Sequence, residues 1–495
     1  MTTASSLLST DFWLSVISLP VWFVVAAGTL AAVGVLDRLL MPSVRWALKK
    51  RANKTIEELN TRLNLRIQPF KLTKRKALID QLRYDPEVLQ AVESYAKDHN
   101  VPREVAMDKA RRYAHEIVPS FSAALYFRVG TRLARRISQS LYRVRLGYSN
   151  TPALQAVDPD AAVVFVVNHR SNMDYIVVTY VASSAAALSY AVGEWAQIWP
   201  LSTLIRSMGA YFIRRNTKDL LYRRIVARYV AMATNAGVVQ AVFPEGGLSR
   251  DGTLRPPKLG LLAYMVQAFD PKGPRDIVFI PVGINYDRVL EDRNLTAAAG
   301  LAPGEEPRFK FNPMVFVGYL AKMTGRKLIG RWYKNGYACV SFGEPLSMRA
   351  YLAKHRLDFR PLSDQDRHRE IEKLGQHLIE AIGKAIPAVP VPLVATALLD
   401  AGPSGLTLFE LKGRVFRLIT DLETHGSYVH IPRDDRDYAI DAGLRLLKLR
   451  KLITEVDGTF RINPADTVIL RYYANSIAHL VRTPQSAEAT PPKAA

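Results

Sequence analysis

A histidine and an aspartate five residues apart form the most conspicuous candidate for chemistry in this chain. The apolar run 162–167 ends in polar residues that include His169 and Asp174. If a tight turn or a helix opens after His169, the Asp174 carboxylate can fold back onto one imidazole nitrogen and leave the other free to take a proton. The pair therefore predicts a general base with an orienting carboxylate. Such a base can activate an alcohol toward a thioester without a covalent enzyme intermediate.

Cations and glycines follow two other apolar runs. The block 209–215 ends in Arg214 and Arg215, whose guanidinium groups suit bidentate contacts with phosphate oxygens. The block 244–250 reads Pro-Glu-Gly-Gly-Leu-Ser-Arg, and its glycines let backbone N–H groups approach a ligand closely. It is not a P-loop, because Thr253 stands where the phosphate-binding lysine would be. Together with Ile280-Pro281-Val282 at a further strand end, these blocks predict a site for a phosphorylated alcohol.

Metal and disulfide chemistry are not expected. No second His, Asp or Glu lies at a convincing metal-ligand spacing from His169, and His115 and His479 fall in helical patterns that indicate structural roles. The single cysteine, Cys339, excludes an internal disulfide, and its strand-like surroundings place it in the core. A reducing compartment follows from this cysteine usage.

The elements that must position these residues begin near residue 161. Short β-branched runs at 162–167, 238–243, 277–282 and 338–342 alternate with helical segments. This alternation predicts an α/β domain, from 151 to 348, with a central sheet flanked by helices and a site at the strand ends.

Helical regions are predicted on both sides of that domain, over 46–150 and 349–482. Asp457-Gly458 within 454–462 is a hairpin signal. A helix followed by a hairpin could indicate a nucleic-acid-binding module, but one such pair is weak evidence, and we expect no nucleic-acid partner. The tail 483–495, rich in Pro, Ala and Thr, is predicted to be disordered.

An N-terminal membrane segment is predicted within residues 1–45. The run 12–36 has no charged residue, and its ~25 residues are long enough to cross a bilayer as a helix. A cleaved signal peptide is the alternative, although Met1 to Asp11 carry no Lys or Arg. Pro20 leaves a re-entrant or interfacial segment open. Basic residues directly after the run place the rest of the chain in the cytoplasm.

The charge balance indicates an anionic partner. Lys and Arg number 67 against 45 acids, a formal charge of +22 over 495 residues. Nucleic acid, anionic lipid headgroups and phosphorylated substrates all fit this charge. Apolar residues at 125, 129, 133, 137 and 141 recur every four positions beside several arginines. This stripe indicates either a helix on an anionic membrane surface or core packing.

The blocks together resemble a known family. His169-Arg-Ser-x-x-Asp174-Tyr, the blocks 209–215 and 244–250, and Ile280-Pro281-Val282 resemble, in order and spacing, the four blocks of the glycerol-3-phosphate acyltransferase family. The branch concerned includes bacterial and mitochondrial enzymes. The likeness extends to segments outside the blocks, which are 79–82, 110–114, 341–345 and 472–480.

The resemblance implies roles for the first two blocks. His169 would be the base and Asp174 its partner. Arg214, with Arg215 as its neighbour, would hold the phosphate of the substrate.

It implies further roles for the third and fourth blocks. Glu245 and Gly246 would organise the acceptor pocket, Ser249 and Arg250 would contact glycerol phosphate, and Pro281 would shape the acyl-donor side.

One departure from the family pattern concerns the third block. Leu248 stands where the family often has an arginine, and Thr253 where a basic residue is often found. Lys258 or Arg255 is the candidate replacement for the missing charge.

The implied function is transfer of a fatty acyl group from acyl-CoA or acyl carrier protein to the sn-1 hydroxyl of glycerol 3-phosphate, which gives lysophosphatidate. The expected location is the cell membrane, with the catalytic domain on the cytoplasmic face and anionic lipids as further partners. No cofactor beyond the acyl carrier is expected. Dihydroxyacetone phosphate or lysophosphatidate as acceptor remains an alternative, and a non-catalytic membrane scaffold is a third.

Overall fold

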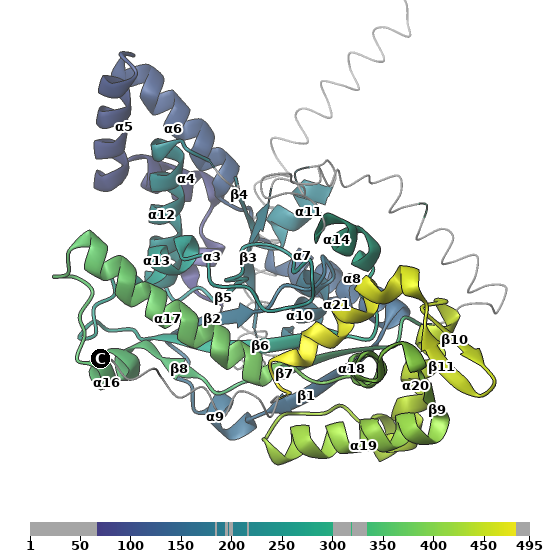
Figure 1. Ribbon diagram of the computed structural model, residues 1–495. Coiled ribbons are helices and arrows are strands. Elements are labelled where there is room, and N and C mark those ends of the chain that lie inside the picture. Colours follow the sequence, from purple (N-terminus) through teal and green to yellow (C-terminus); the bar gives the residue numbers. More distant parts are fainter. Residues whose placement is uncertain are drawn as a thin grey trace, which may run out of the picture. The chain divides into compact units, whose positions relative to one another are not determined.

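The computed structural model describes residues 67–183, 186–193, 197, 201–214, 217–299, 318 and 334–481 (Figure 1). The predicted membrane segment 12–36, the predicted disordered tail 483–495 and Arg215 lie outside these residues. Within the described ranges, no helix is both long and apolar enough to cross a membrane.

An eight-stranded sheet forms the centre of the fold, in the order β1-β7-β6-β2-β5-β3-β4, with β8 paired to β6. Strands β6, β2, β5, β3 and β4 run parallel, whereas β7 and β8 are antiparallel to β6. The bounds are β1 Arg143–Ser149, β2 Ala162–Val167, β3 Ser189–Gly193, β4 Tyr211–Ile213, β5 Gln240–Val242, β6 Ile277–Tyr286, β7 Tyr337–Phe342 and β8 Leu346–Ser347. The predicted α/β fold with a central sheet is confirmed.

Helices cover both faces of the sheet. In β2, Phe165 and its alternate neighbours join one apolar core, and Val164 and its alternates join the other, as the period of two in a strand requires. The first core includes α10 (Asp174–Ala182), α18 (Pro390–Ala401) and α21 (Thr467–Ala478). The second includes α12 (Leu220–Asn235), α13 (Gly260–Val266), α16 (Met348–His355) and α17 (Asp364–Ala385).

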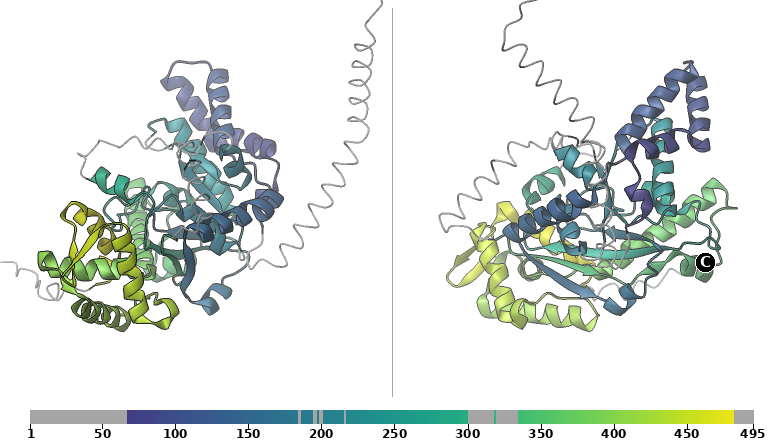
Figure 2. Two further views of the ribbon diagram at one scale, coloured as in Figure 1. Left: turned by 90° about the vertical axis from the view of Figure 1, so that its right-hand side faces the viewer. Right: turned by 180° about the vertical axis from the view of Figure 1, so that it is seen from behind.

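The predicted N-terminal helical region is mostly helical where it is described. It comprises α3 (Pro69–Leu72), α4 (Arg75–Arg83), α5 (Pro86–Asp98), α6 (Arg103–Ile117), α7 (Ala123–Leu125), a π-helical turn (Tyr126–Gly130) and α8 (Thr131–Leu141). Helices α5 and α6 lie near the β4 end of the sheet, and the C-terminal elements lie near its other end, as the views in Figures 1 and 2 agree. Three short helices, α9 (Thr151–Gln155), α11 (Leu201–Ser207) and α14 (Asp292–Ala299), connect strands of the central sheet.

The C-terminal region is helical with a small sheet. Helices α19 (Leu408–Thr424) and α20 (Arg436–Leu449) join α18 and α21, and β9 (Leu406–Thr407) pairs with the hairpin of β10 (Ile453–Val456) and β11 (Thr459–Ile462). The predicted hairpin is confirmed. Asp457 and Gly458 both have positive φ, of 50° and 72°, which a tight two-residue turn between strands requires.

Three predicted boundaries are corrected. The sheet begins at Arg143, inside the range 46–150 that was predicted to be helical, because β1 is an exposed edge strand whose arginines mask its strand pattern. Strand β5 is shorter than the predicted 238–243. Strand β6 continues past Val282 to Tyr286, because β7 pairs with it along that stretch. The sequence does not predict this extension, since Gly283 and Asn285 interrupt the apolar run.

Candidate active site

The His169–Asp174 contact is present at the end of β2. Helix α10 begins at Asp174, and the Asp174 backbone N–H donates to the Ser171 carbonyl at 3.0 Å, which closes the turn. His169 Nδ1 lies 2.9 Å from Asp174 Oδ2. The predicted fold-back of the carboxylate onto the imidazole is therefore confirmed as geometry.

Four donors fix the Asp174 carboxylate. Besides His169 Nδ1, Oδ2 accepts the backbone N–H groups of Arg170 (2.7 Å) and Ser171 (2.9 Å), and Oδ1 accepts the Tyr286 hydroxyl (2.7 Å). Burial and the neighbouring Asp174 charge raise the pKa of Tyr286 well above its usual value, so that the hydroxyl stays a donor. This arrangement favours a proton on Nδ1 of His169 and leaves Nε2 as a proton acceptor.

Aromatic rings hold the imidazole. The Phe243 ring stacks on His169 with 4.2 Å between centroids, and Tyr175 contacts it edge to face at 5.4 Å. The His169 side chain is only 3% exposed. Its Nε2 makes no hydrogen bond to any described residue, and this atom is not fully enclosed by the protein. The ring is therefore immobilised with Nε2 uncommitted.

Glu245 joins the ends of β2 and β5. Its Oε1 accepts the His169 backbone N–H at 2.7 Å, and its Oε2 accepts the Arg255 backbone N–H at 3.0 Å. Burial raises the pKa of this carboxyl, and the two backbone donors oppose that shift. Glu245 thus positions His169 through its backbone and also fixes the loop that follows β5.

The strand register places three predicted site residues at one level. The parallel pairing aligns one residue of each of the strands β2, β5, β3 and β4 at the same level. Three residues after the aligned position come His169 after β2, Glu245 after β5 and Arg214 after β4. Their side chains therefore lie along the same edge of the sheet. Because β4 is three strands from β2, the Arg214 backbone lies roughly 14 Å from that of His169. The aligned positions are Val166, Val242, Ala191 and Tyr211.

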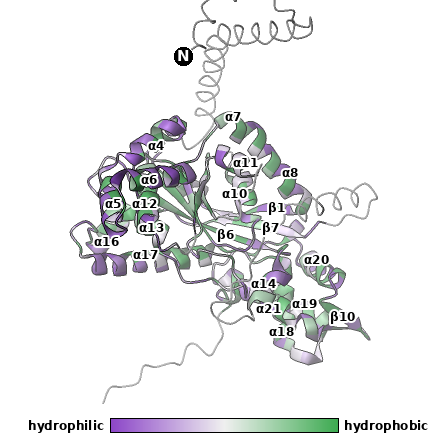
Figure 3. Ribbon diagram, turned by 90° about the horizontal axis from the view of Figure 1, so that it is seen from above, coloured by the Kyte–Doolittle hydropathy of each residue, from purple (hydrophilic) through white to green (hydrophobic). Residues whose placement is uncertain are grey.

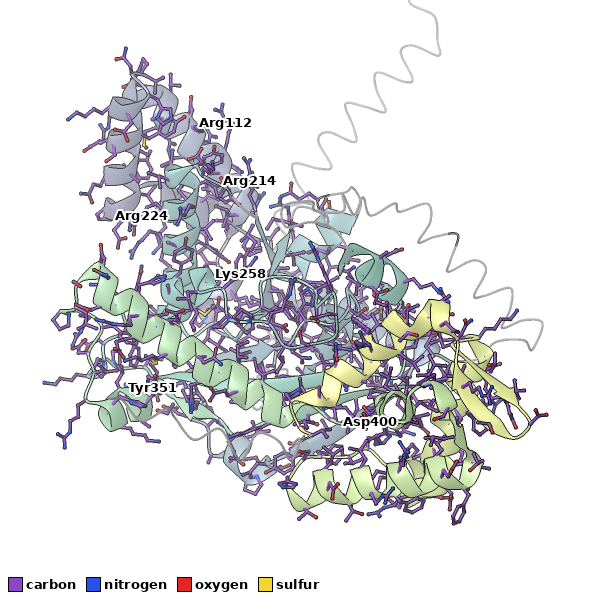
Figure 4. The ribbon with its side chains drawn as sticks, viewed as in Figure 1. Arg112, Arg214, Arg224, Lys258, Tyr351 and Asp400 are labelled. Carbon is purple, nitrogen blue, oxygen red and sulfur yellow. The ribbon has the colours of Figure 1, made fainter. Side chains whose placement is uncertain are left out.

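Arg214, which is labelled in Figure 4, forms a bidentate ion pair with Glu116 of α6. Its Nε donates to Oε1 at 2.9 Å and a terminal nitrogen donates to Oε2 at 2.6 Å. The rings of Tyr113 and Tyr222 lie within 5.1 Å of the guanidinium. Hydrogen bonding to Glu116 raises the pKa of Arg214. A phosphate would have to compete with Glu116 for this side chain, which is 39% exposed.

Ser249 stabilises the loop after β5 from within. Its hydroxyl donates to the Thr253 carbonyl at 2.8 Å and accepts the Gly252 N–H at 3.0 Å, and its backbone N–H donates to the His169 carbonyl at 3.0 Å. The residue is 1% exposed. These contacts attach the loop to His169, and the predicted contact of Ser249 with a ligand stays a prediction. Arg250 is half-buried and has no hydrogen bond or ion pair with any other described residue.

Two basic residues lie over the glycine pair of this loop. Gly246 has a φ of +66°, and a Cβ built there would come 2.5 Å from Lys258 Cδ. The Arg255 guanidinium is the nearest side chain to Gly247. The two candidate replacements for the missing arginine therefore lie beside the predicted loop. Lys258 is labelled in Figure 4. The Gly246 N–H donates to the Phe243 carbonyl at 3.0 Å, whereas the Gly247 N–H makes no hydrogen bond to a described residue.

Pro281 lies inside β6 rather than at its end. It pairs with Val166 of β2, and its carbonyl accepts the Gly343 N–H at 2.8 Å. It therefore lies about three residues short of the level of His169. Because β6 is longer than predicted, Tyr286 near its end reaches Asp174.

Sequence reasoning missed two further neighbours of the catalytic pair. Glu291 accepts the Ser171 hydroxyl at 2.8 Å, and burial raises the pKa of this carboxyl. The Arg170 guanidinium donates to the Gly252 carbonyl and lies 4.7 Å from the Tyr472 ring of α21. These contacts join segments more than 80 residues apart, so no local spacing in the sequence signals them.

Comparison with known proteins agrees with this arrangement. Residues 147–285 match the family model described as Acyltransferase, and residues 326–487 match the one described as Glycerol-3-phosphate acyltransferase C-terminal region.

Similar proteins include the glycerol-3-phosphate acyltransferases of Aeromonas hydrophila and Alteromonas mediterranea, each 28% identical over 84% and 83% of this chain. These alignments cover 51% and 50% of the relatives, so the chain spans about half the length of the curated relatives that it matches. A crystal structure of the 1-acyl-sn-glycerophosphate (LPA) acyltransferase PlsC from Thermotoga maritima is 17% identical, with a TM-score of 0.29, and covers 51% of this chain and 78% of that one.

The two model matches lie in sequence order, and the first contains all four blocks around His169. The resemblance predicted from those blocks is confirmed: the chain is similar to an acyltransferase model over 147–285 and to the C-terminal region of glycerol-3-phosphate acyltransferases over 326–487.

Proposed function

We propose that this protein is a glycerol-3-phosphate acyltransferase that transfers a fatty acyl group from acyl-CoA or acyl carrier protein to the sn-1 hydroxyl. The observation that carries the proposal is the 2.9 Å contact between His169 Nδ1 and Asp174 Oδ2, beside a basic, glycine-containing loop. The named relatives support the choice of acceptor.

The proposed reaction is a direct transfer. Nε2 of His169 takes the proton of the sn-1 hydroxyl, and the oxygen attacks the thioester carbonyl carbon. Collapse of the tetrahedral species breaks the C–S bond, and the imidazolium returns its proton to the departing thiolate, so that no cofactor is consumed. Asp174 stabilises the imidazolium, and the Gly247 N–H is the candidate donor to the developing oxyanion.

The phosphate of the acceptor is proposed to bind the cations of the third block. Arg250 has no competing partner among the described residues, and Arg255 and Lys258 lie on the same loop. Arg214 and Arg215 complete the proposed set from the end of β4. Arg214 would have to release Glu116 to bind the phosphate. We therefore propose that Arg214 is a peripheral phosphate ligand.

Attachment to the cytoplasmic face of the cell membrane is part of the proposal. Leu125, Val129 and Leu133 are 42%, 45% and 41% exposed, whereas Leu141, at the other end of the same stripe, is buried in the core. Exposed arginines at 128, 132, 135 and 136 flank them, and Figure 3 shows α8 on the outside of the fold with both kinds of residue. The exposed part suits an anionic headgroup layer, and the segment 12–36 is proposed to enter the membrane.

The test is turnover with each acceptor. Membranes containing the protein receive a labelled acyl thioester with glycerol 3-phosphate, dihydroxyacetone phosphate or lysophosphatidate. We expect lysophosphatidate to form from glycerol 3-phosphate and no comparable product from the other two. Equal or faster turnover of another acceptor would reject glycerol 3-phosphate as the acceptor. Full activity in His169→Ala would reject the proposed mechanism.

A further inference from the structure

A second basic pocket lies apart from His169. A cavity of about 190 Å³ is lined by residues from the starts of β1 and β7 and from the segment that leads into α20. Arg143 and Arg145 of β1 line it together with Arg433, and no acidic residue lines it. None of these three arginines forms an ion pair with any other residue in the described parts of the chain. Three guanidinium groups around one small cavity, without a counter-ion, suit a ligand of high negative charge.

Aromatic rings hold these cations in place. The Arg143 and Arg145 guanidinium groups lie 5.5 and 5.9 Å from the Tyr337 ring, and that of Arg433 lies 4.2 Å from the Tyr438 ring. Arg433 has a φ of +63°, which is uncommon for a residue other than glycine. The backbone is therefore held in an unfavourable conformation at the residue that supplies the third cation, a feature that often marks ligand-binding segments.

A buried histidine completes the pocket. His430 is 7% exposed, its ring packs against Tyr337 at 4.9 Å, and its Nε2 is enclosed without a hydrogen-bond partner among the described residues. Burial, aided by Arg145, lowers the pKa of this imidazole to about 4. An enclosed polar atom without a partner is costly unless a ligand reaches it.

The position of the pocket decides which ligand can use it. Tyr337 is two strands from β2 and about three residues beyond the level of His169, which places its backbone roughly 14 Å from that of His169. The sn-1 oxygen and the phosphorus of glycerol 3-phosphate are five bonds apart, at most about 7 Å. The phosphate of the acceptor is assigned above to the loop after β5, which lies nearer to His169. We therefore assign the charge of this second pocket to the other, longer substrate.

We propose that this pocket binds the ribose 3′-phosphate of a nucleotide-bearing acyl thioester, the chemistry of acyl-coenzyme A. The inference rests on the proposed acyl transfer and names the donor for it. This phosphomonoester lies at the far end of the donor from the sulfur. The dianion would bind the three guanidinium groups and His430, and the thioester would extend along the strand ends toward His169.

Binding and turnover test the two ideas separately. In titration calorimetry with the full chain in detergent, adenosine 3′,5′-bisphosphate should bind at least tenfold more tightly than adenosine 5′-phosphate. Arg433→Gln should remove most of that difference. The matched control is Arg436→Gln, three residues on, whose guanidinium pairs with Glu423 outside the pocket. Inorganic phosphate that competed as strongly as the bisphosphate would assign the pocket to free phosphate and overturn the proposal.

Steady-state kinetics form the second arm. Arg433→Gln should raise the KM for palmitoyl-CoA roughly tenfold or more, in line with loss of a charge-assisted contact, and should not raise it for palmitoyl-3′-dephospho-CoA. Arg143→Gln should behave likewise. An equal rise for both donors, a rise confined to glycerol 3-phosphate, or turnover with acyl carrier protein alone would overturn the proposal. Selective bisphosphate binding without any acyl transfer would instead reject the proposed function and leave the pocket intact.

Discussion

Replacement of Asp174 by Asn isolates the charge of the catalytic carboxylate. Oδ2 accepts three N–H groups, from His169, Arg170 and Ser171, whereas Oδ1 accepts only the Tyr286 hydroxyl. The amide oxygen is therefore expected to take the place of Oδ2, and the amide NH₂ can donate to the Tyr286 oxygen. In this orientation the imidazole keeps its position and its Nδ1 proton, and only the negative charge is lost.

The magnitude follows from the contact distance. Nδ1 and Oδ2 are 2.9 Å apart, so the centres of charge in the imidazolium–carboxylate pair are about 4 Å apart. At an effective dielectric constant of about 20, their attraction is about 4 kcal/mol. Its loss in the transition state lowers kcat by up to about 10³-fold. The KM for glycerol 3-phosphate should change little, because Asp174 is enclosed and cannot touch the acceptor.

The assay is steady-state acyl transfer, with thermal unfolding of each variant as the check on folding. Asp174→Asn combined with Tyr286→Phe leaves the amide NH₂ without a partner, so it should be about 1–3 kcal/mol less stable than Asp174→Asn. Tyr142→Phe is the matched control, since its hydroxyl donates to the Arg288 carbonyl and not to Asp174. A kcat of Asp174→Asn within threefold of the unmodified protein would refute the charge argument.

Three other substitutions probe the phosphate contact, the loop and a buried carboxyl. Arg214→Gln should raise the KM for glycerol 3-phosphate about tenfold, and an unchanged KM would leave Arg214 as a partner of Glu116 only. Gly252→Ala should lower stability by at least about 1–3 kcal/mol, because its φ is +92° and the new Cβ would lie 1.9 Å from the Tyr472 carbonyl oxygen; an unchanged melting temperature would contradict this. Burial raises the pKa of Asp287 to about 7, against about 3.9 in an unfolded chain, so the folded state binds more protons between pH 4 and 7. Stability should therefore fall by up to about 4 kcal/mol as pH rises through this window, and urea unfolding should show a smaller fall in Asp287→Asn.

The parts of the site that the sequence predicts correctly are local. His169 and Asp174 are five residues apart, so one turn at a strand end brings them together, and the residue types indicate what they do. The strand Ala162–Val167 is predicted with its observed bounds, because it is buried on both faces and uniformly apolar. The hairpin at Asp457-Gly458 is predicted because its two-residue turn has a strong composition signal.

The parts that the sequence does not predict depend on pairing between distant segments. Glu116 precedes Arg214 by 98 residues, so nothing near the arginine signals its bidentate partner. The reach of β6 to Tyr286 depends on pairing with β7, and this pairing brings a tyrosine hydroxyl to Asp174. The edge strand β1 alternates arginines with apolar residues and resembles the helical pattern before it.

The C-terminal region packs against the loops that hold the proposed catalytic base. The Tyr472 ring of α21 lies over the Arg170 guanidinium, and the Tyr472 carbonyl packs so closely on Gly252 that no Cβ fits there. Arg170 is the immediate neighbour of His169, and Gly252 lies in the loop that Ser249 attaches to the His169 carbonyl. Removal of α21 would therefore expose both loops that hold the imidazole. Because the geometry of the proposed base depends on those loops, loss of this helix should reduce kcat even if the sheet stays folded.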